Sequence, residues 1–167
     1  MIIDTFPFNK DFNALEIRLE ELKGVVDIFI ASESAFTHSG IRKELYLANA
    51  KALRAKMGDK LVVLSNTKSY LTSNARTREM LQRQEITKYL IKVNPKPSSL
   101  IFHSDCDEIP RASTISSLKN KSNCNVLLEM RNFTNYLNME LGVWARARVV
   151  SGKNYRSIEN LRQDIFL

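Results

Sequence analysis

The sequence predicts an α/β fold, in which a mostly parallel, Rossmann-like sheet carries helices on both faces. Short apolar stretches rich in β-branched residues alternate with stretches whose apolar residues recur at helical spacing, and this alternation is typical of β-α-β units. The chain has 167 residues, of which 44% are hydrophobic. A chain of this length can bury roughly 70% of the surface that its unfolded form exposes. We therefore expect a single domain over residues 1–167.

The first half of the chain alternates strand and helix twice. Residues 1–8 predict a short strand that runs into a turn, which Pro7 and the polar residues 9–11 mark. Residues 11–24 predict a helix, because their leucines recur every three or four positions and a glycine follows. Residues 25–32 and 60–66 are β-branched runs typical of buried strands, and a second helix is expected between them at 44–57.

The second half continues the alternation with the longest helical pattern of the chain. That pattern stops at "NPKPSS", where two prolines prevent a helix from continuing. Polar loops separate the later segments and mark their ends. The expected elements are a helix at 75–93, strands at 100–104, 125–139 and 144–152, and a short helix at 112–121.

Three polar segments follow predicted strands. They are Asp4–Thr5, Glu33–Gly40 and Asp105–Glu108. In a parallel sheet the ligand binds in the crevice at the carboxyl ends of the strands. The order of elements therefore predicts that these three segments meet around one cleft.

The stretch "LIFHSDCDEIP" carries three carboxylates in four positions directly after an apolar strand. Asp105, Asp107 and Glu108 would repel one another if all were ionised and shielded from water. Two interpretations remain open on these residues alone, a solvated acidic turn and a cation site. Converging carboxylate oxygens suit Mg²⁺ or Mn²⁺, which take one or two protein carboxylates and complete their shell with water and phosphates.

The chain carries a formal net charge of +7. Arg76 and Arg83 lie seven residues apart in the predicted long helix and so share a face, where arginine suits bidentate phosphate recognition. A solvated basic face is the alternative. His38 lies in a polar loop from which it could reach a ligand. The sequence shows no zinc-finger spacing and no aromatic RNA-binding signature, so no nucleic-acid partner is expected.

The remaining signals concern compartment and redox state. No apolar stretch approaches the ~20 residues that a membrane span requires, and the first residues lack the basic region of a signal peptide. Cys106 and Cys124 give no disulfide framework, and Cys106 is expected to act as a small filler side chain. We therefore expect a cytoplasmic protein.

Several motifs together resemble glycosyltransferase family 17, which contains β-1,4-mannosyl-glycoprotein β-1,4-N-acetylglucosaminyltransferases. They occur in order from Ile3 to Arg111. After Arg111 the resemblance is weaker and rests on "NFTNYLN" and on a tryptophan followed by arginine. The motifs are "DTFPFN", "LEIRLEEL", "ES…THSG…K", "RE…QR…I" and "SDCDEIPR".

The resemblance implies a GT-A-like fold and an inverting transfer from a nucleotide sugar, with UDP-GlcNAc as the expected donor and a glycan or other hydroxyl as the acceptor. It implies that Asp105 and Asp107 bind Mn²⁺ or Mg²⁺, which would bridge the donor phosphates. Glu108 would help to shape the turn. The substrate-binding residues implied in the same way are Asp4, Thr5, Phe6 and Glu33 near the nucleoside, and Arg78 and Arg83 near the phosphates or sugar.

An inverting transfer also needs a general base, for which Glu129 and Asp164 are the candidates. By the same resemblance, a further segment rich in Gly, Trp and His is expected after Leu167, including a late histidine for the metal. The family's Golgi members carry a membrane anchor, so a soluble bacterial or viral relative is expected here. The rival functions are a metal-dependent phosphohydrolase or nuclease, and a non-catalytic relative that binds nucleotide sugars.

Overall fold

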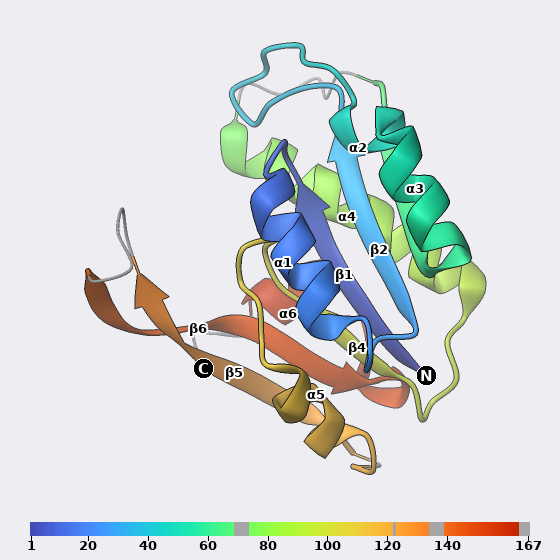
Figure 1. Ribbon diagram of the computed structural model, residues 1–167, viewed down its shortest axis with the longest axis vertical. Helices are drawn as coiled ribbons and strands as arrows, with labels where there is room; N and C mark the ends of the chain where they lie inside the picture. Colours follow the sequence, from blue (N-terminus) through green and yellow to red (C-terminus); the bar gives the residue numbers. More distant parts are fainter. Residues whose placement is uncertain (69–73, 122, 134–138, 164–167) are drawn as a thin grey trace.

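The structure is a computed structural model that describes residues 1–68, 74–121, 123–133 and 139–163. The described residues form one six-stranded sheet with helices on both faces (Figure 1). The strands are β1 (Ile2–Phe8), β2 (Ile28–Ser34), β3 (Leu61–Asn66), β4 (Leu100–His103), β5 (Asn125–Phe133) and β6 (Glu140–Ser151). The helices are α1 (Phe12–Leu22), α2 (Tyr46–Asn49), α3 (Lys51–Met57), α4 (Ala75–Val93), α5 (Ala112–Leu118) and α6 (Ile158–Gln163), with 3₁₀ turns η1 (Gly58–Lys60) and η2 (Gly152–Asn154).

The sheet is mixed, so the expectation of a mostly parallel sheet was wrong for the two pairings that β6 makes. The order is β3-β2-β1-β4-β6-β5, and the first four strands are parallel. β6 pairs antiparallel with both β4 and β5. The short connection between Phe133 and Glu140 is the physical reason for the β5–β6 pairing, because a parallel neighbour would need a crossover of a dozen or more residues.

Alternating side chains of the central strands build two cores, one on each face of the sheet. Ile2, Phe6 and Phe8 point to the face that α1, α2 and α5 cover, while Ile3 points to the face covered by α4 and α6. β2 and β4 alternate in the same way, since successive side chains of a strand point to opposite faces. Helices on both faces, as the sequence predicted, therefore follow from strands that are apolar on both sides.

The helices differ from the sequence prediction at two places. The single helix expected at 44–57 is divided into α2 and α3 at Ala50, whose backbone (φ −74°, ψ 68°) leaves the helical region. The helix α6 was not predicted. By contrast, α4 has the predicted ends, because the Asn74 side chain accepts from the amides of Arg76 and Thr77, and Asn94 adopts a left-handed φ of 46°.

The strand ends fix which polar residues reach the cleft. β1 continues to Phe8, so Asp4 and Thr5 lie in mid-strand and not at its end, as the sequence had suggested. β4 is shorter and ends at His103, opposite Thr5 of β1, and the acidic segment follows it directly. Among the helices of the described ranges, none is long and apolar enough to cross a membrane.

Candidate functional site

Residues 104–110, which we call the acidic turn, follow β4 directly. Two hydrogen bonds close the turn: the Glu108 amide donates to the Asp105 carbonyl at 3.1 Å, and the Asp105 amide donates to Glu108 Oε2 at 2.8 Å. The Ser104 hydroxyl also donates to the Glu108 carbonyl at 2.9 Å. The backbone of the turn is thereby held in one conformation.

Arg18 of α1 anchors the acidic turn from inside the protein. Its fully buried guanidinium binds both carboxylate oxygens of Asp4, at 2.6 and 2.7 Å. Its Nη1 donates to the carbonyls of Asp105, Cys106 and Glu108, at 2.8 to 3.2 Å. Burial alone would lower the pKa of Arg18, but the Asp4 carboxylate raises it above its ordinary value, so Arg18 stays charged.

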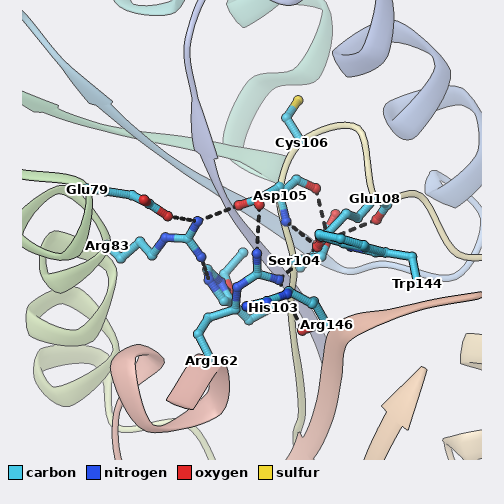
Figure 2. Close-up of polar contacts among 12 residues, drawn as sticks. Glu79, Arg83, His103, Ser104, Asp105, Cys106, Glu108, Trp144, Arg146 and Arg162 are labelled. Atoms are coloured by element: carbon cyan, nitrogen blue, oxygen red, sulfur yellow. Dashed lines mark hydrogen bonds and ion pairs between the residues drawn. The ribbon is translucent and has the colours of Figure 1, made fainter. Parts of the chain in front are cut away.

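Two arginines, which we call the arginine clamp, hold the Asp105 carboxylate (Figure 2). Arg83 of α4 donates to Oδ1 at 2.6 Å, and Arg162 of α6 donates to Oδ2 at 2.7 Å. Arg83 also pairs with Glu79 one helical turn earlier. Asp105 therefore joins α4, α6 and the acidic turn through one side chain.

Glu108 links the acidic turn to β6 and α6. Its Oε2 accepts from Arg162 Nη1 at 2.9 Å, and its Oε1 accepts from the indole N–H of Trp144 (Figure 2). Only 8% of Glu108 is exposed. Both carboxylate oxygens are thus used inside the protein, and Glu108 contributes structure and negative charge to the site.

Asp107 is the exposed carboxylate of the acidic turn. The pKa of its carboxyl is raised, first because the turn shields one side of it from water and then because Asp105, Glu108 and Asp11 add negative charge. A bound cation would remove that repulsion. Asp107 therefore has the accessibility and the electrostatic surroundings of a cation ligand.

The metal pair expected from the resemblance fits Mn²⁺ or Mg²⁺ only in part. Asp107 can supply oxygen to a cation, whereas both oxygens of Asp105 accept from the arginine clamp. No group of three or more His, Cys, Asp or Glu residues in the described ranges is arranged to hold a metal. Because Mg²⁺ is commonly held by one or two carboxylates plus substrate phosphates, the residues present suit a cation that arrives with a phosphorylated ligand.

Two cavities lie near Asp105, one lined by the acidic turn itself and the other by Arg83 and Arg162, which hold the Asp105 carboxylate. The first, of about 460 Å³, we call the acidic cavity. The second, of about 500 Å³, we call the arginine cavity. The acidic cavity is lined by Asp105, Asp107, Glu108, Ile109, Met130, Arg131, Asn132, Phe133 and Trp144. The arginine cavity is lined by His38, Ala75, Arg76, Glu79, Met80, Arg83, Arg146, Glu159 and Arg162.

A chain of hydrogen bonds runs from Arg83 into the sheet. Thr5 Oγ1 donates to the Phe102 carbonyl at 2.9 Å and lies 2.9 Å from His103 Nδ1, which assigns the proton to Nδ1. The other ring nitrogen faces Arg83 Nη1 at 3.5 Å. The pKa of His103 lies well below its ordinary 6.5, chiefly through burial and then through the charges of Arg83, Arg162 and Arg18. His103 is therefore neutral, and its ring lies against Arg83 of the arginine clamp.

The four residues expected near the nucleoside lie inside the protein. Asp4, Thr5, Phe6 and Glu33 are all fully buried. Asp4 holds Arg18, and Phe6 packs in the core with its ring 4.6 Å from the Arg18 guanidinium. Glu33 accepts from the amides of Leu47 and Ala48 at 3.0 to 3.1 Å, at the start of α2. These four side chains have their partners inside the protein, and their contact with a nucleoside stays a prediction.

The loop after β2 is tied to α4 beside the arginine cavity. Arg78 donates to the His38 carbonyl at 2.7 Å, and His38 Nε2 lies 3.1 Å from Gln82 Oε1. Gln82 in turn donates to the carbonyls of Phe8 and Ser32, at 3.3 and 2.8 Å. Arg78 thus shapes the loop, and its contact with donor phosphates stays a prediction.

Only one of the two candidate general bases, Glu129, belongs to the described residues. Glu129 is exposed on β5 and lines a cavity of about 390 Å³ that shares Met130, Arg131 and Phe133 with the acidic cavity. Asp164 lies outside the described residues. Cys106 packs in the core, and burial raises the pKa of its thiol to about 12, in keeping with a filler side chain.

Three residues important to the site were missed in the sequence. Arg18 carried a signal, because it falls on the same helical face as Leu15 and Leu19, where a charge requires a buried partner. Arg162 gave no such signal, since α6 is short and has a weak pattern. In the sequence, Trp144 stood out only as part of a weak match to the family motifs.

Comparisons with known proteins bear on the whole chain. No curated protein matches the chain at a significant level. A family model described as "Glycosyltransferase family 17" matches residues 1–161 of the 167. The match includes β1, the acidic turn and most of α6, so every described residue of the two cavities except Arg162 lies within it. The chain belongs to glycosyltransferase family 17.

Proposed function

We propose that this glycosyltransferase moves a sugar, with GlcNAc as the first candidate, from a nucleotide-sugar donor to a hydroxyl of a glycan or similar acceptor, with Mn²⁺ or Mg²⁺ bound. The observation that carries the proposal is Asp107, an exposed carboxylate that follows β4 and lines the acidic cavity. Two residues before it, Asp105 is held by Arg83 and Arg162, which line the arginine cavity. A divalent cation at this position would supply Lewis-acid stabilisation of the negative charge on a departing diphosphate.

The arrangement around Asp107 supports a donor that spans both cavities. Guanidinium groups line the arginine cavity and suit phosphate oxygens. The acidic cavity combines the Trp144 and Phe133 rings with the amide of Asn132 and the acidic turn. Apolar surface with a few polar groups is usual for a small-molecule site and suits the faces and hydroxyls of a sugar ring.

The fold supports the proposal at a coarser level. Four parallel strands, β3-β2-β1-β4, bring their carboxyl ends to the edge where the acidic turn lies. The antiparallel β6 then places Trp144 beside Glu108. We take this arrangement to be a GT-A-like donor site, with the acceptor expected on the side of β5, where Glu129 is the general base in our proposal.

A panel of nucleotide sugars with and without Mn²⁺ tests the proposal. We expect one donor to raise the melting temperature with Mn²⁺ but not with EDTA, and to release its nucleoside diphosphate when an acceptor is added. Binding without any release over long incubation would favour the non-catalytic alternative. No metal-dependent shift with any donor, together with metal-dependent cleavage of DNA or RNA, would favour the nuclease instead.

A further inference from the structure

The arginine cavity carries more positive than negative charge. Its lining contains four arginines and two glutamates. Arg83 and Arg162 are paired with carboxylates, but Arg76 and Arg146 form no ion pair within the described part of the chain. Arg146 instead stacks on Trp144, with its guanidinium 5.3 Å from the ring centroid. The cavity is therefore suited to an anionic ligand.

The amino-terminal end of α4 adds to this potential. α4 has 19 residues and no acidic residue in its first turn. Arg76 lies in that turn and lines the cavity, where its positive charge is repelled by the positive end of the helix dipole. An anion bound there would offset both charges.

The anion that the arginine clamp holds in this structure is the Asp105 carboxylate. The side chains of Arg83 and Arg162 are 6% and 13% exposed, whereas that of Asp105 is 32% exposed. The buried Arg83 Nε–H also has no acceptor among the residues described. The two guanidinium groups thus contact an accessible carboxylate on one side and line the arginine cavity on the other.

We propose that the arginine cavity is a diphosphate-binding site, formed by Arg76, Arg83, Arg146 and Arg162, and that Asp105 holds its arginine clamp in place until the diphosphate displaces it. This inference rests on the proposed function, because it assigns the donor's diphosphate to that cavity. Phosphate oxygens match the bidentate geometry of arginine, and a diphosphate can reach more of the four guanidinium groups than a single carboxylate can. Once displaced from Arg162, Oδ2 of Asp105 becomes available to a cation beside Asp107.

Inorganic pyrophosphate tests the site without a nucleotide, a sugar or a metal. Pyrophosphate is titrated in EDTA by calorimetry, with Trp144 fluorescence as a second readout, since this one tryptophan of the sequence contacts Arg146 and donates to Glu108. We expect saturable binding that is tighter than that of orthophosphate. Arg162→Gln should weaken it about tenfold or more. Arg76→Gln, at an exposed position where folding is not at risk, should weaken it in the same direction.

Arg156→Gln is the matched control, because it removes one exposed arginine outside the cavity. Equal weakening by this control and by Arg76→Gln would show general attraction to a basic protein and overturn the inference. No saturable binding of pyrophosphate, with metal-dependent donor binding intact, would also overturn it and leave the proposed function standing. Pyrophosphate binding without any donor binding or transfer would contradict the proposed function alone.

Discussion

Arg18 and Asp4 form a fully buried ion pair, 2.6 Å between Nη2 and Oδ1, and the same guanidinium donates to three carbonyls of the acidic turn. The pair connects α1, β1 and the segment after β4. The position of Asp107 therefore depends on two residues whose side chains are fully buried. This relationship explains why charged residues occupy otherwise apolar faces of α1 and β1.

Removal of one partner of this pair should be strongly destabilising. Arg18→Met leaves the Asp4 carboxylate buried without its cation, so the free energy of unfolding should fall by about 3–5 kcal/mol. The double variant Asp4→Asn, Arg18→Met should recover part of that loss. Urea unfolding followed by circular dichroism measures both. Glu20→Gln, which breaks the exposed pair with Lys23, is the control and should change little.

The indole N–H of Trp144 should stabilise the acidic turn. Trp144→Phe keeps an aromatic ring but leaves Glu108 Oε1 without this donor. Because Trp144 is 36% exposed and water can partly replace the bond, we expect a loss of about 1 kcal/mol in unfolding free energy. Denaturant unfolding followed by circular dichroism is the measurement. Unchanged stability would show that the bond between β6 and the turn contributes nothing.

The neutral state of His103 predicts a specific pH dependence of stability. The folded pKa lies below 6.5 and the unfolded pKa is about 6.5, so between these values the unfolded chain binds the extra proton. The free energy of unfolding should therefore fall as the pH drops below 6.5, by at most about 1.4 kcal/mol per pH unit for this group. His103→Gln should flatten the curve between pH 6.5 and 5.5. A variant curve parallel to that of the wild type would contradict the assignment.

The arginine clamp should weaken cation binding in the absence of a ligand. Arg162→Gln frees Oδ2 of Asp105 and removes one positive charge near Asp107. Both effects favour a cation, so Mn²⁺ should bind roughly tenfold more tightly, a difference of about 1.4 kcal/mol. Electron paramagnetic resonance of free Mn²⁺ gives the affinity without turnover, and Arg156→Gln is again the control. Equal affinity in the Arg162 variant and wild type would show that Asp105 takes no part.

Local sequence patterns predicted much of the fold because each acts within one element. The ends of α4 followed from Asn74 and "NPKPSS", and the acidic turn was placed after β4 by the apolar run before it. The direction of β6 was not predicted, since a strand's pattern shows which residues are apolar and not which neighbour it pairs with. The division between α2 and α3 depends on the backbone of Ala50, which no special residue marks.

The site was predicted less completely because its contacts join distant segments. Asp105 binds Arg83 and Arg162, which lie 22 and 57 residues away in the sequence. The local pattern around α6 does not indicate the contact between Arg162 and Asp105. Asp4 looked like a residue at a strand end, yet its meaning depends on Arg18, 14 residues later. The sequence thus located the acidic turn, and tertiary structure decided which of its carboxylates faces solvent.

The role of Asp107 is tested most directly by calorimetric titration of UDP-GlcNAc, in the presence of Mn²⁺, into the wild type, Asp107→Asn and the control Asp59→Asn. Asp59 is an exposed acid of η1, away from both cavities, so its variant matches the loss of charge. We expect Mn²⁺-dependent binding in the wild type and Asp59→Asn, and loss of that dependence in Asp107→Asn. Binding that is equally Mn²⁺-dependent in Asp107→Asn would contradict the central role of Asp107.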